Sequence, residues 1–422
     1  MIAWSETQLM IRDAMRKFCE TEIEPNLEAL EHGDTPPYDV LRKLMSTFGT
    51  DTMALERFEK DIAREKAIAA GEIAEVKSER SAPAAAEEIA QRADAIAMRL
   101  IPSIELSRFC PGMVTAMGVS VGLTAGAILS KGTIAQKERW APKLLTMEHV
   151  GAWAITEPNS GSDAFGSMKS TCKHSDDGGY TLNGNKTFIT NGPYADTIIF
   201  ICKLDEPGVE ARKRKVLSFI LDTGMEGLTQ SKPFRKMGIH SSPTGELFLS
   251  DVKVGPERLL GETEEVSARS GAKDTFSQER AGVASMALGI VERCLELSVA
   301  YANTRVQFGQ SIGQFQLIQM KLAKMEVARV NLQNIVFRFI ELLAHGSSPS
   351  LAEASAMKLY AAQAAVDVAM EAVQIHGGNG YMAEYRVEQL ARDAKILQIY
   401  GGTDEIQITH IARDLLARDA SS

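Results

Sequence analysis

One stretch of this chain has β-sheet character and lies between two helical stretches, and this order limits the possible folds more than any other feature. Within residues 150–265 the runs "DTIIFICKL", "KVLSFILDT" and "GELFLSDVKV" are rich in β-branched and aromatic residues and are separated by Gly, Pro and Asp. Such runs predict strands. An Asn183-Gly184 pair in "GGYTLNGNKTFITNG" predicts a hairpin turn. We interpret residues 150–265 as a small antiparallel barrel or sandwich.

Helical patterns fill both flanks of this β region. Ser5 and Gln8 form a capping-box pattern at the start of residues 5–20. Further helices are predicted within 53–100, interrupted near Pro83, then at 111–146, 275–304, 313–345, 350–376 and 403–418. The expected fold class is therefore a multidomain α+β protein with an N-terminal helical domain (1–149), a middle β domain (150–265) and a C-terminal helical domain (266–422).

Composition excludes several classes of protein. The net charge of −9 and the pI near 5.5 argue against nucleic acid or an anionic membrane as the main partner. By inspection we find no apolar run of about 18 residues, so no transmembrane helix is expected. The start, "MIAWSETQLMIRDAMRK", lacks the features of a signal or transit peptide. Five scattered cysteines without a CxxC pair indicate a reduced, cytoplasmic protein with no disulfide framework and no metal site.

Five motifs occur in a fixed order along the chain. They are "WAITEPNSGSD" (153–163), "FITNG" (188–192), "RVQFGQSIGQFQLIQMKLAKM" (305–325), "QIHGGNGYMAEYRVEQLARDAKI" (374–396) and "QIYGGTDEIQ" (398–407). Together the motifs resemble the acyl-CoA dehydrogenase family, whose members oxidise acyl-CoA thioesters with bound FAD. The resemblance implies an N-terminal helical domain, a middle β domain and a C-terminal four-helix bundle. It also implies a homotetramer built as a dimer of dimers.

Glycine clusters lie in two of these motifs, but no GxGxxG opens a helix after a strand. From the residues alone, "HGGNG" after a predicted helix indicates a helix C-cap at Gly377 or Gly378. The resemblance adds that this loop, and the arginine and phenylalanine of "RVQFG", reach the FAD of a neighbouring subunit. The cofactor residues implied for this region are Arg305, Gln307, Phe308, Gln316, Gln374, Gly377 and Gly378.

The resemblance places a second set of residues at the flavin ring. Trp153, Ile155 and Thr156 are implied to line the ring, Phe188 to stack on it and Thr190 to lie near its N5 edge. Ser162 is implied to contact both flavin and the CoA pantetheine, and Thr403 and Glu405 to lie beside FAD. An ordinary turn and hairpin would also explain the residues of the middle domain, and acids in a first helical turn are favoured electrostatically without any chemistry.

Gly401 stands where many family members carry the glutamate that takes the substrate α-proton. The resemblance implies that its backbone N–H donates to the thioester carbonyl, and this donor needs no side chain. Glu279, in "KDTFSQERAGVASMALGIVERCL", is the candidate replacement base. A Thr275–Gln278 capping box predicts that a helix starts there, which puts Glu279 in its first turn. The helix N-terminus would stabilise the carboxylate while burial raises its pKa. Counting on from Glu279 along one helix face gives an apolar stripe, Val283, Met286, Ile290 and Leu297.

From the residues alone, Glu279 is equally explained as a partner of the helix dipole or of a cation. Adjacent residues of a helix do not face each other, which disfavours Arg280 as that cation. Similarity to the isovaleryl-CoA and long-chain types, which carry their glutamate just before the arginine of this helix, implies that Glu279 is the base. The same resemblance puts Ser277, where many relatives have aspartate, and Arg280 on the substrate side.

The function implied is FAD-dependent α,β-dehydrogenation of an acyl-CoA to the trans-2-enoyl-CoA in acyl-CoA or fatty acid catabolism. In that reaction flavin N5 takes the β-hydride, and electron-transfer flavoprotein takes the electrons. Alternatives are a relative with altered chemistry, such as a desulfinase or an oxygen-using oxidase, or a non-catalytic flavin-binding subunit. The helices of 53–100 replace a Gly/Pro-rich loop of the family, so acyl length and branching are not predicted. Our hypothesis is that a glycine at 401 leaves room for a bulky or branched acyl group.

Overall fold

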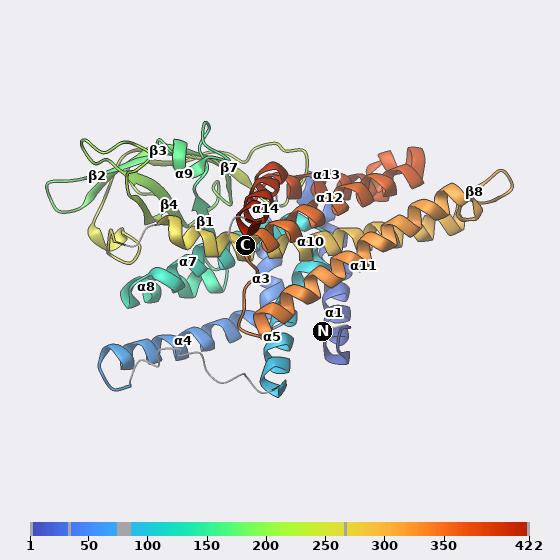
Figure 1. The fold of residues 1–422 in the computed structure, drawn as a ribbon, viewed down its shortest axis with the longest axis horizontal. Coiled ribbons are helices and arrows are strands. Elements are labelled where there is room, and N and C mark those ends of the chain that lie inside the picture. The colour runs from blue at the N-terminus through green and yellow to red at the C-terminus, as the bar shows by residue number, and fades with distance from the viewer. Residues whose placement is uncertain (1–2, 33–34, 74–85, 266–267, 420–422) are drawn as a thin grey trace.

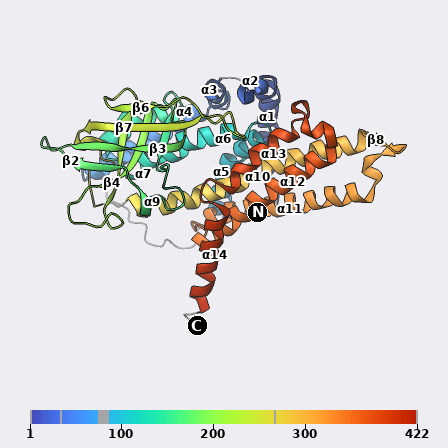
Figure 2. The same cartoon turned by 90° about the horizontal axis from the view of Figure 1, so that it is seen from above.

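The computed structural model describes residues 3–32, 35–73, 86–265 and 268–419. In Figures 1 and 2 the β domain lies at one end of the long axis and the long helices extend to the other end. The short hairpin of β8 (Val306–Gln307) and β9 (Gln310–Ser311) forms that far tip. A site that needs both ends therefore cannot be assembled within a single chain.

The N-terminal region is helical, as predicted. Ser5 caps the first helix and forms the expected capping box with Gln8. The Ala/Glu/Lys-rich stretch forms two helices, and the predicted break at Pro83 lies outside the described residues. A π-helical segment, Gly118–Ala125, joins α6 to α7. The helices are α1 (Glu6–Phe18), α2 (Leu27–His32), α3 (Tyr38–Thr47), α4 (Thr50–Ala69), α5 (Ala86–Ser107), α6 (Pro111–Met117), α7 (Gly126–Lys131) and α8 (Ile134–Leu145).

The middle region forms a seven-stranded sheet in the order β1-β4-β2-β3-β7-β6, with β5 paired to β4. The expectation of an all-antiparallel domain is wrong in one respect, because β1 and β2 both run parallel to β4. Apolar side chains of α8 and of the segment before it cover one face of the sheet. The elements are β1 (Gly151–Ala154), α9 (Ala164–Ser167), β2 (Thr171–His174), β3 (Tyr180–Thr190), β4 (Thr197–Leu204), β5 (Val216–Asp222), β6 (Leu228–Gln230) and β7 (Thr244–Val254).

The hairpin predicted at Asn183-Gly184 is wrong. Strand β3 continues through this pair, and the pairing with β7 shifts register between Leu182 and Gly184. The turn lies earlier, where Ser175 N donates to Gly179 O at 3.0 Å between β2 and β3. Gly184 is required for packing instead, because a Cβ there would come within 2.1 Å of the Ser170 hydroxyl oxygen.

The C-terminal region contains the long helices expected from the sequence. Gly377 ends α12 with φ +60°, which confirms the predicted glycine C-cap. The short helix α13, between two 3₁₀ turns, was not predicted. The helices are α10 (Ala268–Thr304), α11 (Gln316–Ala344), α12 (Leu351–His376), α13 (Val387–Lys395) and α14 (Asp404–Asp419). Side chains from α1, α5, α10, α11 and α12 share one hydrophobic core.

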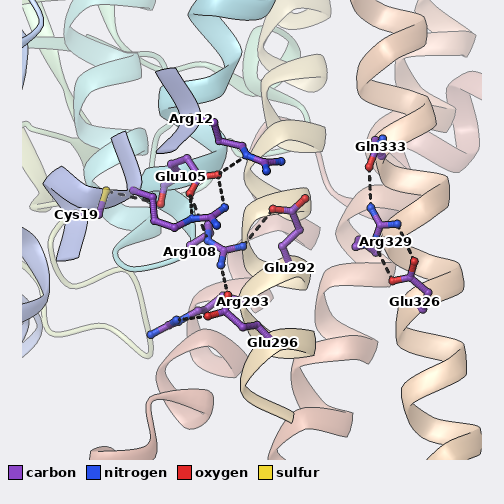
Figure 3. Close-up of polar contacts among 11 residues, drawn as sticks. Arg12, Cys19, Glu105, Arg108, Glu292, Arg293, Glu296, Glu326, Arg329 and Gln333 are labelled. Atoms are coloured by element: carbon purple, nitrogen blue, oxygen red, sulfur yellow. Dashed lines mark hydrogen bonds and ion pairs between the residues drawn. The ribbon is translucent and has the colours of Figure 1, made fainter. Parts of the chain in front are cut away.

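A buried ionic network joins α1, α5 and α10 within this core (Figure 3). The Glu105 carboxylate is fully buried and accepts two bonds from Arg16, each 3.0 Å long. Arg108, only 4% exposed, lies 3.4 Å from Glu105 and pairs with Glu292 and Glu296 of α10. Burial raises the pKa of Glu292 above its ordinary value, against the opposing effect of Arg108. The network fixes α10 against α5.

One segment of the described chain, Pro111–Lys131, has the length and mean hydropathy (1.7) of a membrane span. Gly, Ser and Thr interrupt its apolar residues, so it is not a continuous apolar run and was not predicted. The segment contacts the β domain through polar groups: Ser120 Oγ accepts from Gly151 N at 2.8 Å, and Ala116 O accepts from Asn191 Nδ2 at 2.9 Å. These bonds are typical of a helix packed inside a folded protein.

Candidate active site

The end of β1 and the end of β3 lie side by side and bring five predicted flavin-ring residues together. Thr187 N donates to Thr156 O at 2.9 Å, and Lys186 Nζ donates to Ile155 O at 3.1 Å. The residues that these bonds bring near one another are Trp153, Ile155, Thr156, Phe188 and Thr190. Motifs about 30 residues apart in sequence thus lie side by side, and we call these five residues the ring-binding group.

Phe188 has the geometry of a ligand-contacting residue. Its φ is +56°, a region that bulky side chains rarely occupy, and its ring is 67% exposed. A register shift between Lys186 and Ile189 accompanies this conformation. A strained backbone that presents an apolar ring to solvent needs a reason, and such sites cluster where ligands bind. The ring, the half-buried Trp153 and the Thr156 hydroxyl fit a flat, hydrogen-bonding molecule such as flavin.

Ser162 lies in the turn that follows this group. It is exposed, while Ser160 is buried and stabilises the turn by donating to Asp163 O at 2.9 Å and Ala164 O at 3.1 Å. The turn therefore leaves the Ser162 hydroxyl at the surface next to the ring-binding group.

A second group surrounds the paired glycines before α14. Gly401 and Gly402 have φ values of +60° and +91°. Gln407 Nε2 donates to both of their carbonyl oxygens, at 3.2 and 2.8 Å, and Lys358 Nζ donates to Gly402 O at 2.9 Å. The conformation suits glycine, and the bonds hold the loop in place. Thr403 Oγ1 accepts from Ile406 N at 3.4 Å at the start of α14.

Arg280 brings α10 to this loop. The side chain is 4% exposed, and Nη1 donates to Ser355 Oγ at 3.4 Å. A Cβ added to Gly402 would lie 3.9 Å from Arg280 Nη2. The Gly401–Gly402 loop and the part of α10 around residue 280 are therefore neighbours.

The side chains of Thr275, Ser277, Gln278 and Glu279 lie outside the described residues, so their contacts stay predictions. The backbone corrects one expectation, because α10 begins at Ala268 and Glu279 is not in its first turn. The argument that the helix N-terminus stabilises its carboxylate therefore fails, since that effect is confined to the first turn. The predicted apolar stripe is buried at Val283, Met286 and Ile290, and Leu297 is partly buried against the same core.

A third group lies at the far tip of the chain, around the β8–β9 hairpin and the end of α12. Phe308 is 94% exposed at φ +49°. Asn379 Nδ2 donates to Tyr301 OH at 3.0 Å and ties the glycine loop to the end of α10. A Cβ on Gly377 or Gly378 would meet no described atom within 4 Å. The exposed residues of this group are Arg305, Gln307, Phe308, Gln316, Gln374, Gly377 and Gly378.

The first group belongs to the β domain and the third to the β8–β9 hairpin and the end of α12, and these parts of the chain are separated along the long axis (Figures 1 and 2). A single chain therefore does not bring Phe308 to Phe188. A cavity of about 360 Å³ between α11 and α12 belongs to none of the three groups and is lined by Asn331, Asn334, Ile335, Arg338, Met357 and Tyr360.

Reasoning from the sequence missed the polar residues that support these groups. Glu157 and Lys186 form a buried pair at 2.8 Å behind the ring-binding group, and Lys358 and Gln407 hold the glycine loop. Ionisable residues within the motifs "ITEP" and "GNKTF" were the available signal, because such residues are rarely buried without a partner.

Comparison with known proteins agrees with this architecture. Three models of the acyl-CoA dehydrogenase family match the chain: the N-terminal domain at residues 82–148, the middle domain at 152–252 and the C-terminal domain at 270–416. An acyl-CoA dehydrogenase of Bacillus subtilis (strain 168) is 35% identical over 413 residues, covering 98% of each chain. A mitochondrial isovaleryl-CoA dehydrogenase of Arabidopsis thaliana is 33% identical over 421 residues, covering 99% of this chain and 93% of the relative.

Solved structures show the same fold. Butyryl-CoA dehydrogenase from Megasphaera elsdenii aligns with a TM-score of 0.81 at 33% identity, over 99% of this chain and 100% of the other. Acyl-CoA dehydrogenase complexed with FAD from Bacillus anthracis aligns with a TM-score of 0.82 at 29% identity, over 99% of this chain and 68% of the other. The fold and these matches thus define a flavin-dependent oxidoreductase. The chain belongs to the acyl-CoA dehydrogenase family, and its cofactor is FAD.

Proposed function

We propose that the protein converts an acyl-CoA to its trans-2-enoyl-CoA, with Glu279 removing the α-proton. FAD, when bound, supplies the hydride acceptor. The observation that carries the proposal is the position of buried Arg280 beside the Gly401–Gly402 loop. Glu279 directly precedes Arg280 in α10, so its backbone is one residue from the arginine whose side chain reaches that loop, and the proposal assigns its carboxylate to the substrate side. The 33% identity to an isovaleryl-CoA dehydrogenase, the type named by the family resemblance, supports the same assignment.

The loop contributes without a side chain of its own. Lys358 and Gln407 bind its carbonyl oxygens. In the proposed reaction the N–H of Gly401 donates to the thioester carbonyl and stabilises the charge that develops when the α-proton leaves. Ser162, Ser277 and Arg280 are proposed to contact the CoA substrate, and Thr403 and Glu405 to contact FAD.

We also propose that two chains complete each FAD site. The third group, with Arg305, Gln307 and Phe308, is exposed and far from the ring-binding group of its own chain, so it is proposed to contact FAD held by a neighbour. An arginine fork suits a diphosphate. Exposed apolar residues along α11, α12 and α14 support assembly into the homotetramer: Leu317 (71%), Val327 (60%), Met370 (56%), Leu415 (57%) and Leu416 (74%). The last helix extends away from the body of the single chain in Figure 2.

Anaerobic titration with a panel of acyl-CoAs, followed at the flavin absorbance, tests the proposal. Removal of a general base lowers the rate of flavin reduction by a factor on the order of 10²–10⁴. Glu279→Gln is expected to show this loss while retaining FAD. Glu326→Gln serves as the control, because it removes a half-exposed carboxylate of α11 that pairs only locally with Arg329 among the described contacts. Full-speed reduction by Glu279→Gln would refute the assignment of the base.

The same titration separates the remaining functions. For the proposed cytoplasmic dehydrogenase, we expect the acyl-CoA to bleach the flavin without oxygen uptake. Electron-transfer flavoprotein should then reoxidise the reduced flavin. Rapid oxygen uptake would indicate an oxidase, loss of sulfite from a sulfinated acyl-CoA would indicate a desulfinase, and stable FAD without reduction would indicate a non-catalytic subunit.

A further inference from the structure

A lysine and a glutamate form a buried ion pair directly behind the ring-binding group. Lys186 is fully buried and Glu157 is 4% exposed. Lys186 Nζ donates to Glu157 Oε1 at 2.8 Å and to Ile155 O at 3.1 Å. Lysine and glutamate are almost never fully buried unless paired, and an apolar pair of similar volume often stabilises a fold as well or better. Stability alone therefore does not account for charges at this position.

The Glu157 carboxylate connects a third segment to this pair. Its Oε1 accepts from Ser170 N at 2.9 Å, and its Oε2 accepts from Lys169 N at 2.6 Å. Although burial acts against the charged form, the Lys186 ammonium and these N–H donors hold the pKa of Glu157 below its ordinary value. Burial also lowers the pKa of Lys186, against the attraction of Glu157. The carboxylate thus links the end of β1, the start of β2 and the middle of β3.

The two residues border the residues that face the flavin. Glu157 directly follows Thr156, and Lys186 comes two positions before Phe188. Lys186 Nζ donates a hydrogen bond to the carbonyl oxygen of Ile155, and Thr187 N donates one to the carbonyl oxygen of Thr156. Consecutive peptide groups of the Thr156 segment are therefore fixed to β3 by bonds from adjacent β3 residues.

The strained conformation of Phe188 requires such support. A bulky residue at φ +56° persists only where its surroundings hold it. Phe188 is 67% exposed, so its own ring packing supplies little of that support. In addition to the pairing of β3 with β7 on either side of Phe188, the bonds made by Lys186 and Thr187 immediately before it fix this segment to the end of β1.

We propose that Glu157 and Lys186 are positioning residues that set the placement of Thr156 relative to Phe188, and through it the affinity for FAD and the environment of the bound flavin. The proposal rests on the proposed function only in taking this surface as the flavin site. Neither residue touches the reacting atoms. Removing Lys186 would free the Ile155 carbonyl and leave a buried carboxylate without its cation, so the end of β1 would shift relative to β3.

Arg258 provides a matched control within the same domain. Its guanidinium also donates to a backbone carbonyl and to a carboxylate, Ile220 O at 3.3 Å and Asp222 at 2.6 Å, and its side chain is 12% exposed. These bonds lie on β5, which β4 separates from β1, and no described contact joins Arg258 to the ring-binding group. Arg258→Met therefore removes a largely buried cation without touching the ring-binding group.

The experiment compares Lys186→Met with Arg258→Met in the purified full chain. The measurements are the dissociation constant for FAD, the visible circular dichroism of the bound flavin and the thermal midpoint of the apoprotein. Loss of one buried charged hydrogen-bond partner is expected to weaken FAD binding by about tenfold or more in Lys186→Met and to change the flavin dichroism. Arg258→Met is expected to lower the thermal midpoint while leaving both flavin measurements unchanged.

Glu157→Gln is a second variant that keeps the side-chain volume and an acceptor for Ser170 N, and it is expected to change the flavin dichroism in the same direction. If Lys186→Met does not fold, the result for Glu157→Gln alone tests whether the ion pair positions the flavin site. An unchanged FAD dissociation constant and dichroism in the folded variants, or equal changes in Arg258→Met, would overturn the inference. In both of these cases, if acyl-CoA still reduced the flavin of the wild-type protein, the proposed function would not be affected. A wild-type protein that bound no FAD would overturn both.

Discussion

Replacing Glu105 by glutamine tests how much the ionic network of Figure 3 contributes to stability. The substitution keeps the shape of the side chain but removes the charge that faces Arg16 at 3.0 Å and Arg108 at 3.4 Å. Removing one partner of a buried pair costs about 3–5 kcal/mol. Arg16 is 29% exposed and Arg108 retains Glu292 and Glu296, so both cations keep some solvation or pairing. We therefore expect about 3 kcal/mol, the lower end of that range.

Glu88→Gln supplies a control on the same helix, α5. Glu88 pairs with Arg92 at the surface, where both side chains are about half exposed. An exposed pair of this kind contributes under about 1 kcal/mol. Urea unfolding of the FAD-loaded protein, followed by circular dichroism at one FAD concentration, measures both variants. The expected result is a clearly lower midpoint for Glu105→Gln and a midpoint close to wild type for Glu88→Gln.

Equal urea midpoints for the two variants would refute the reasoning, because the buried Glu105 charge would then contribute no more to stability than the exposed Glu88 charge. A loss in Glu105→Gln has a functional corollary. Arg108 connects Glu105 to α10, the helix that carries Glu279. The variant is therefore also expected to reduce flavin more slowly than wild type at temperatures below its unfolding transition.

Two further predictions concern other parts of the molecule. Burial, and the neighbouring Glu31 charge, raise the pKa of Asp393 to about 8, so the folded protein holds a proton that the unfolded chain has released. Stability should then fall as the pH rises from about 4 to about 8, and Asp393→Asn should flatten the profile of thermal midpoint against pH. Lys236, whose pKa burial lowers to about 8, stays protonated in both states below that pH and adds no slope there. Phe308→Ala, at a ring 94% exposed, is expected to weaken FAD binding with little change in the thermal midpoint of the apoprotein, and a clear drop in that midpoint would contradict its assignment to a neighbour's cofactor.

Local rules predicted much of the fold. Apolar spacing gave the long helices, the glycine after α12 is the expected C-cap, and Ser5 forms the expected capping box. The same kind of rule failed at Asn183-Gly184, because pairing with β7 and the close approach of Ser170 decide the conformation there. It failed again at the start of α10, where the helix extends back to Ala268 past the apparent capping box.

The sequence predicts the candidate site residues that belong to motifs. It does not predict the supporting residues whose roles depend on contacts between distant segments. Five motif residues lie at or near the ends of β1 and β3, and their contacts with FAD stay predictions. Glu157 and Lys186 are 29 positions apart, and their buried ion pair depends on where β3 runs. The hairpin wrongly predicted at Asn183-Gly184 had broken β3 just before Lys186. The positive φ of Phe188 accompanies a register shift that no local signal in the sequence specifies. The domain boundaries at 149/150 and 265/266 stay predictions.

The distance between the ring-binding group and the β8–β9 hairpin has a genetic consequence. If each hairpin serves a neighbour, a chain with Phe188→Ala joined to a chain with Phe308→Ala forms one site that carries both lesions and one that carries neither. Co-expression of the two single-substitution chains should then restore activity that neither chain has alone. A chain that carries both substitutions should restore no activity when it is co-expressed with either single-substitution chain.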